Sequence, residues 1–170
     1  LEYLEKMNFS KLDENDKRPA SALGGFTNGV SPLEMAAGYA TIENDGYYRE
    51  PTCILKITDS SGEKILSTKQ EETAVYKENA SRMMTDILKG VLTNGTGRGL
   101  ALDGMPCAGK TGTTNENKDG WFVGYTRYYT TSVWVGYDMP KKLSGLSGAS
   151  YPGRIWKTFM QKIHEGLEPQ

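Results

Sequence analysis

Histidine is almost absent from this sequence of 170 residues, which holds one, His164, and only two cysteines, Cys53 and Cys107. Catalysis by a Ser-His-Asp or Cys-His arrangement needs a histidine beside the nucleophile. His164 lies in an amphipathic C-terminal segment, and we expect it to be a solvated or helix-capping residue. The cysteines lack the spacing of a metal site or a disulfide framework, so we expect both to be free and buried. The sequence therefore predicts no metal and no cofactor.

The sequence also lacks an excess of charge and a long apolar run. Its 20 lysines and arginines balance 21 aspartates and glutamates, and the basic residues do not cluster, which argues against a nucleic-acid partner. No stretch approaches the roughly 18 apolar residues of a membrane span. The apolar fraction of 37% is that of a globular domain. Because the chain opens at Leu1 without a methionine, we expect a piece of a longer protein, attached to a membrane only through an upstream anchor.

Capping signals and helical spacing predict the helices. Ser31 before Pro32, with Glu34 three positions after the serine, is the pattern of a capping box, so a helix should begin here. Apolar residues at helical spacing predict a second helix over 80–91, in which we expect Met83 and Met84 to be core. A final helix should open at Pro152. Its expected buried side consists of Ile155, Trp156, Phe159, Met160 and Ile163.

Runs rich in β-formers predict the strands. Residues 53–58 and 64–67 should flank a turn, and residues 121–126 and 130–137 should form an antiparallel hairpin. Both faces of that hairpin carry bulky side chains, so we expect the sheet to be covered on both sides. There is no internal repeat and no linker that would mark a second domain.

One short stretch, Lys110-Thr111-Gly112-Thr113-Thr114, concentrates a lysine, three hydroxyls and a glycine. Strand alternation would place Thr111 and Thr113 on one face and the other three residues on the opposite face. The glycine leaves room for a ligand or another chain to approach the backbone. Charge, hydroxyls and accessible N–H groups together suit an anionic or carbonyl-bearing ligand.

The same stretch completes a misleading match, because residues 104–111 fit the phosphate-binding pattern G-x-x-x-x-G-K-[ST]. That motif needs a buried strand before its first glycine and a helix N-terminus just after its lysine. Here the upstream residues are irregular, and Gly112 with the polar run behind it opposes a helix. The sequence therefore argues against nucleotide binding.

A serine–lysine mechanism requires S-x-x-K on a helix and S-x-N beside a K-T-G strand. The K-T-G element is present. The one S-x-x-K, Ser61 to Lys64, lies in a predicted turn and contains a glycine, and no S-x-N occurs. We therefore expect no nucleophile in this chain.

Further segments accompany the K-T-G strand in a fixed order. They are Ala22-Leu23-Gly24-Gly25, Gly29-Val30-Ser31-Pro32-Leu33-Glu34, Gly95-Thr96-Gly97, Asp119-Gly120-Trp121-Phe122-Val123-Gly124-Tyr125, Val133-Trp134-Val135-Gly136-Tyr137-Asp138 and Ile155-Trp156-Lys157. With the K-T-G strand, this ordered set resembles the class A penicillin-binding proteins, the bifunctional peptidoglycan synthases. The likeness covers nearly the whole chain.

The resemblance implies an α/β fold of the α+β type, with an antiparallel sheet of about five strands flanked by helices. It implies that residues 1–170 are the C-terminal part of a single D,D-transpeptidase domain and that the fold is incomplete in this chain. The acylating serine, its lysine and the S-x-N motif would lie upstream, with a glycosyltransferase domain and a membrane anchor beyond them. The parent protein would act at the extracytoplasmic face of the bacterial membrane.

Roles for single residues also follow from the resemblance. The Thr113 backbone N–H would be one oxyanion-hole donor, and Lys110 would supply positive potential and a hydrogen bond into the missing serine motif. The hydroxyls of Thr111 and Thr113 would bind the carboxylate of a D-Ala-D-Ala stem peptide or of a β-lactam inhibitor, with Gly112 and Thr114 completing the substrate site. The N-terminal part of the domain would be a partner, possible as a separate chain.

Three alternatives remain at this point. A nucleotide binder, against which the context of the motif argues, would be identified by thermal stabilisation with Mg-ATP. A serine β-lactamase or β-lactam sensor has the same fold, and rapid turnover of a β-lactam would identify it. A non-catalytic binding module would keep the strand without the chemistry, and the upstream sequence would identify it.

Overall fold

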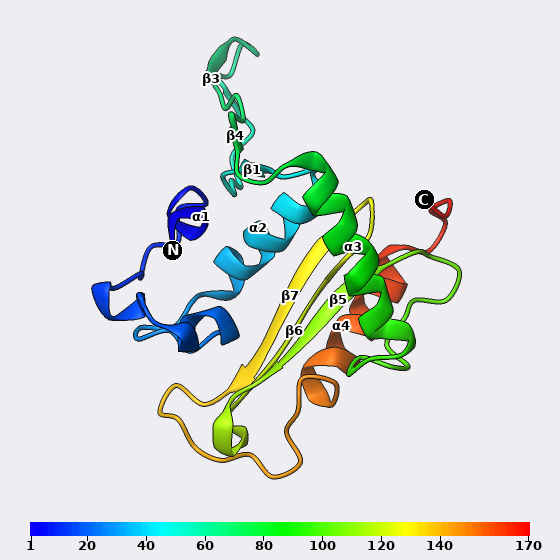
Figure 1. The fold of residues 1–170 in the computed structure, drawn as a ribbon. Coiled ribbons are helices and arrows are strands. Elements are labelled where there is room, and N and C mark those ends of the chain that lie inside the picture. The colour runs from blue at the N-terminus through cyan, green and yellow to red at the C-terminus, as the bar shows by residue number, and fades with distance from the viewer.

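The computed structural model describes residues 1–170, and its main sheet has three antiparallel strands in the order β5-β6-β7. These strands are β5 (Ala108–Thr113), β6 (Asp119–Tyr125) and β7 (Thr130–Gly136). Two small antiparallel sheets pair β1 (Tyr47–Arg49) with β4 (Glu72–Ala74) and β2 (Lys56–Thr58) with β3 (Lys64–Ser67). This last hairpin projects away from the body of the molecule (Figure 1). Of the sheet of about five strands implied by the resemblance, this chain supplies three.

Helices cover both faces of the main sheet, as predicted. The helices are α1 (Glu2–Glu5), α2 (Pro32–Glu43), α3 (Glu78–Thr93) and α4 (Tyr151–Ile163), with 3-10 turns at Glu14–Asp16, Pro19–Leu23 and Asn115–Asn117. α2 packs on β6 and β7, and α3 packs on β5 (Figure 1). α4 packs on β6 and β7 from the opposite face. The result is a three-layer arrangement in which β5 and β7 form the two edges.

The predicted capping box sets the start of α2. The Ser31 side chain accepts a hydrogen bond from the Glu34 backbone N–H at 3.2 Å, and the Glu34 carboxylate accepts one from the Ser31 N–H at 2.7 Å. Pro32 occupies the first helical turn, where a missing N–H has no consequence. Beyond the helix end, Gly46 has a φ of +94°, and its carbonyl receives the N–H groups of Val75 and Tyr76.

The largest buried apolar cluster lies between the sheet and α4. Phe122, Trp156 and Met160 are fully buried, and the rings of Phe122 and Trp156 meet at 4.8 Å between centroids. The Trp156 indole donates to the Gly124 carbonyl at 3.2 Å. A β-carbon at position 124 would lie 2.6 Å from the Trp156 ring, so close packing on α4 requires this glycine.

Several predicted core residues are exposed. Met83 and Met84 on α3 are 66% and 43% exposed, because α3 turns Leu88 and Leu92 toward the interior instead. On α4, Ile155 and Phe159 are about half exposed while Trp156 and Met160 are buried. The predicted buried faces of α3 and α4 thus included residues that no other part of this chain covers.

The cysteine and histidine predictions were partly wrong. Both cysteines are free, but Cys53 is exposed because it precedes the projecting hairpin, and Cys107 is half-buried. His164 is the C-cap residue of α4, yet it is buried and not solvated. Its Nδ1 donates to the Met160 carbonyl at 2.6 Å, and its Nε2 lies 2.8 Å from the Thr126 hydroxyl. Hydrogen bonding inside the molecule therefore explains its position.

No helix in the structure combines the length and the apolar character needed to cross a membrane.

Candidate functional site

The K-T-G residues lie together on an edge strand. β5 is paired only with β6, with Lys110 opposite Val123 and Thr113 opposite Gly120. Thr114 follows the strand directly and closes it, since its N–H donates to the Asp119 carbonyl at 3.0 Å. All five residues singled out from the sequence are therefore neighbours along one open edge of the sheet.

The direction of the Thr113 backbone N–H follows from this register. In an antiparallel ladder, hydrogen-bonded and non-hydrogen-bonded pairs alternate along the strand. Because Thr114 bonds to Asp119 across the ladder, the next pair, Thr113 with Gly120, is of the non-hydrogen-bonded kind. The N–H of Thr113 therefore points away from β6, toward the open edge of β5.

The hydroxyls of Thr111 and Thr113 lie on one face, as alternation predicted. Thr111 stands opposite Phe122, whose ring packs on α4, so this face is the α4 face. The Thr111 hydroxyl is 2.6 Å from the hydroxyl of Thr96. The Thr113 hydroxyl accepts a hydrogen bond from the Gly148 backbone N–H at 3.0 Å. Both oxygens are thus held from within the protein.

Lys110 is exposed and takes part in none of the ion pairs of the chain. Its ammonium group donates to the Thr111 carbonyl at 2.8 Å. A lysine held beside an open strand edge without a carboxylate partner gives that edge a positive potential.

A polar cluster fixes the far end of the strand. The Asp119 carboxylate accepts hydrogen bonds from the Trp134 indole at 3.0 Å and from the Thr114 hydroxyl at 3.1 Å. The Thr114 hydroxyl in turn accepts from the Asp119 N–H at 2.8 Å. These contacts tie β5 to β6 and β7 just beyond Thr113, and so they restrict movement of the K-T-G residues.

Glycines bring a loop onto the strand. A β-carbon at Gly148 would lie 2.5 Å from the Trp121 carbonyl and 2.7 Å from the backbone of Gly112, so the loop before α4 rests directly on the ladder. A β-carbon at Gly112 would lie 3.1 Å from the Trp121 side chain. Packing of the protein itself thus favours glycine at position 112, whatever else approaches the strand.

The two nucleophile candidates that the sequence offered, Ser61 and Cys107, are not poised for attack at this site. Ser61 lies in the exposed turn between β2 and β3, where its hydroxyl donates to Asp59 at 2.7 Å. Burial raises the pKa of the Cys107 thiol, which disfavours the reactive thiolate. The phosphate-loop geometry is also absent, because Lys110 lies inside a strand and not before a helix.

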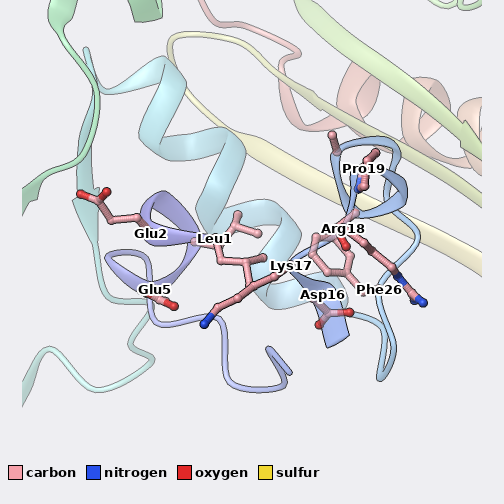
Figure 2. Close-up of a pocket in the computed structure, with 11 residues that line it drawn as sticks. Leu1, Glu2, Glu5, Asp16, Lys17, Arg18, Pro19 and Phe26 are labelled. Carbon is pink, nitrogen blue, oxygen red and sulfur yellow. The ribbon is translucent and has the colours of Figure 1, made fainter. Parts of the chain in front are cut away.

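One well-defined cavity lies away from this strand. It has a volume of about 770 Å³ and lies beside α1 and the 3-10 turns, with the residues around Asp16, Lys17 and Arg18 at its wall (Figure 2). Two of its charged groups are already engaged: Asp16 accepts from the Thr27 hydroxyl at 2.7 Å, and Lys17 pairs with Glu14 at 2.7 Å. No convergent set of free polar groups marks it as a reaction site, so the open edge of β5 is the better candidate.

Comparison with known proteins places this strand in a family context. Residues 4–161 match the family model described as the penicillin binding protein transpeptidase domain. The chain belongs to the penicillin-binding protein transpeptidase family. The class A resemblance identified in the sequence is thereby confirmed.

Curated relatives in this family are longer than the chain. Penicillin-binding protein 4 of Bacillus subtilis is 37% identical over 162 residues, which are 95% of this chain and 26% of that protein. Penicillin-binding protein 1F of the same organism is 38% identical over 161 residues, or 91% of this chain and 22% of that protein. The chain thus spans about a quarter of the length of these relatives.

Solved structures of penicillin-binding proteins share the fold. PonA1 of Mycobacterium tuberculosis, in complex with penicillin V, superposes with a TM-score of 0.85 at 26% identity. The match covers 98% of this chain and 50% of that one. Penicillin-binding protein 1A of Haemophilus influenzae gives a TM-score of 0.81 at 23% identity over 99% of this chain and 31% of that one.

Sequence reasoning missed three residues that contact the K-T-G strand. Gly148 belongs to no recognised motif, and its contact with Thr113 follows only from the position of the loop before α4. Asp119 opened a recognised segment but had no assigned function. Thr96 lay within the Gly95-Thr96-Gly97 segment that the resemblance had pointed out, so its position was signalled although its contact with Thr111 was not.

Proposed function

We propose that this chain is the C-terminal part of a serine D,D-transpeptidase domain that cross-links peptidoglycan through an acyl-enzyme. Residues 1–170 supply the K-T-G wall of the cleft, and the nucleophilic serine, its lysine and the S-x-N motif come from the N-terminal part. The proposal rests on the outward-facing N–H of Thr113 on an open strand edge. The hydroxyls of Thr111 and Thr113 lie together on one face of this strand. Lys110, on the opposite face, has no ion-pair partner.

The arrangement suits a peptide that ends in a carboxylate. A stem peptide laid along β5 would add a strand to the open edge, using the backbone groups that β6 leaves free. The hydroxyls of Thr111 and Thr113 would bind its terminal carboxylate. The Thr113 N–H would then face the carbonyl under attack and stabilise the developing oxyanion.

Lys110 contributes positive charge and does not act as the nucleophile. Its ammonium group, now bonded to the Thr111 carbonyl, would lie between the strand and the serine motif of the N-terminal part. In an enclosed cleft its potential acts more strongly than in water and favours an anionic ligand. A β-lactam with a carboxylate would take the same place and remain as a covalent inhibitor.

The location of the whole protein follows from the same proposal. A domain that cross-links peptidoglycan works at the extracytoplasmic face of the bacterial membrane, and an anchor upstream of this chain would hold it there.

Labelling with a fluorescent penicillin tests the proposal. This chain alone should stay unlabelled, whereas the complete domain should carry one label on a serine of its N-terminal part. Lys110→Gln should reduce the labelling rate of the complete domain by at least about tenfold. Lys118→Gln, in the nearby loop and paired only with Glu116, is the matched control and should leave the rate unchanged.

Stoichiometric labelling of this chain alone would contradict the assignment of the nucleophile. An unlabelled complete domain would contradict the proposed function and favour a binding module. Rapid hydrolysis of the penicillin would instead favour a β-lactamase of the same fold.

A further inference from the structure

In the loop between α3 and β5, the side chain of Thr96 forms a hydrogen bond with the K-T-G strand. Its hydroxyl oxygen lies 2.6 Å from that of Thr111, and the geometry allows either hydroxyl to be the donor. None of the roles assigned above to the K-T-G residues uses this contact. It places a hydroxyl from outside the motif in direct contact with Thr111, one of the two residues proposed to bind the carboxylate of the ligand.

The turn that carries Thr96 is held firmly against α3. The N–H of Gly95 donates to the Gly90 carbonyl at 3.1 Å, and the N–H of Gly97 donates to the Val91 carbonyl at 3.0 Å. A β-carbon at Gly95 would lie 2.8 Å from the Val91 backbone, so the turn packs closer than other residues would allow. Thr96 therefore projects from a fixed support and does not depend on a mobile loop.

The direction of the hydrogen bond between the two hydroxyls has a chemical consequence. A hydroxyl has one proton to donate and can accept through its lone pairs. If Thr111 donates to Thr96, it has no proton left for a carboxylate. If Thr96 donates to Thr111, the Thr111 proton is free to point at the ligand. A carboxylate bound at Thr111 accepts only, so it selects the second arrangement.

Thr113 already has this arrangement. Its oxygen accepts from the Gly148 N–H, which can only donate, so the Thr113 proton remains available. With Thr96 as donor, Thr111 and Thr113 become a matched pair in which each oxygen accepts a hydrogen bond from within the protein and each proton faces outward. Chains of hydrogen bonds of this kind strengthen one another.

We propose that Thr96 is a positioning residue for the carboxylate site. Its hydroxyl donates to Thr111 and so directs the Thr111 proton toward the carboxylate of a stem peptide or β-lactam. The inference rests on the proposed function, because it concerns the ligand of that same site. It extends the site beyond the K-T-G motif to the turn after α3.

Acylation kinetics of the complete domain test this role. With a penicillin that bears a free carboxylate, Thr96→Val should lower the second-order acylation rate constant about five- to tenfold, the effect of losing one hydrogen bond near a charge. Thr96→Ser keeps the hydroxyl and should restore the rate. Thr93→Val removes a hydroxyl of the same region that is bonded to the Gly90 carbonyl, and it should have no effect.

Two further measurements separate positioning from simple support of the loop. With the methyl ester of the same penicillin, Thr96→Val should change the rate by less than about twofold, because a charged acceptor is no longer present. In a Thr111→Val background, Thr96→Val should cause no further loss, since coupled residues are not additive. A purely structural role would slow both substrates equally and would add to the effect of Thr111→Val.

An unchanged rate for Thr96→Val with the free acid would overturn the inference, as would an equal loss with the ester. The melting temperature of each variant shows whether the domain remains folded. Labelling of the wild-type domain by penicillin tests the proposed function. Only the variants test the role of Thr96. A wild-type domain that penicillin does not acylate would overturn both.

Discussion

At the scale of single residues, the candidate site depends on which atoms of the threonines remain free. The Thr113 oxygen is held by the Gly148 N–H, so its proton and the outward-facing N–H are the groups left for a ligand. Alternation along β5 places the Thr113 side chain on the face opposite to that of Lys110. A few atoms with defined directions, and not a large cavity, make up the proposed site.

Replacement of Thr113 by valine tests the role of its hydroxyl. In the complete domain, Thr113→Val should lower the penicillin acylation rate about tenfold and destabilise the fold by about 1 kcal/mol, because the Gly148 N–H loses its acceptor. Thr113→Ser, which keeps the hydroxyl, is the control. Stopped-flow acylation and thermal unfolding measure the two effects, and an unchanged rate at an unchanged melting temperature would refute the assigned role.

A methyl group added by a glycine-to-alanine substitution would overlap other atoms at Gly148 but not at Gly90. Gly148→Ala should destabilise the chain by about 1–3 kcal/mol, because the new β-carbon would overlap the backbone of β5 and β6. Gly90→Ala, inside α3 with no atom within 4 Å of its β-carbon position, should stabilise by about 1 kcal/mol. Urea denaturation of both variants checks the pair. Equal effects would show that the loop moves freely away from the strand.

At the scale of elements, capping and packing explain why the predicted helices are where they are. α2 begins at its capping box, and α4 is fixed by Trp156 against Gly124. The strand β5 is short, and its register is fixed by β6 and by the cluster of Asp119, Thr114 and Trp134. β5, the strand that carries the candidate residues, is thus held in register by residues of β6 and β7.

The cap of α2 should give the chain an acid-sensitive stability. Although burial raises the pKa of Glu34, hydrogen bonds from the N–H groups and hydroxyls of Ser10 and Ser31 outweigh it and lower the pKa to about 2. The unfolded chain therefore takes up the proton at higher pH than the folded one, and stability rises with pH between these values. The contribution of Glu34 is fully present above about pH 5 and is lost as the pH falls toward 2.

Glu34→Gln should accordingly flatten the decline in stability between about pH 5 and pH 2. Urea unfolding at a series of pH values provides the measurement. Ser10→Ala, which removes one of the donating hydroxyls, should flatten it less. A Glu34→Gln profile as steep as that of the wild type would show that other groups control the acid transition.

At the scale of the whole molecule, one strand edge and one helix face stay uncovered in this chain. β7 is an edge strand paired only with β6, and open edges expose unpaired N–H and C=O groups. On α4, the residues Tyr151, Ile155 and Phe159 form a stripe at intervals of one turn, and each is at least half exposed. The solved relatives have chains two to three times as long as the part that this one matches.

We therefore expect the N-terminal part of the domain to bind this chain. When it is supplied as a separate polypeptide, it should raise the melting temperature in a concentration-dependent way, as mass action requires. It should also restore penicillin labelling. Ile155→Asp on the α4 stripe should weaken this association, whereas Lys157→Gln, which lowers the charge of the same helix by the same one unit, is the control for the change in charge. A stable monomer of this chain that ignores the N-terminal part would contradict the expectation.

Sequence alone determined the positions of α2, α3, α4 and the hairpin β6–β7, because capping residues and apolar periodicity are local signals. It also determined the K-T-G strand, the alternation of its side chains and the family, since these depend on residue order. Predictions of burial failed at Met83, Ile155 and Cys53, because exposure depends on which surface lies opposite.

Tertiary structure decided how the strand is held. The contacts of Thr96 with Thr111, of Gly148 with Thr113 and of Asp119 with Trp134 join residues 15, 35 and 15 positions apart. No local pattern encodes such contacts, because they exist only after the loops have packed on the sheet. The sequence thus predicted which residues form the proposed site, and only the folded chain showed which of their atoms are not bonded within the protein.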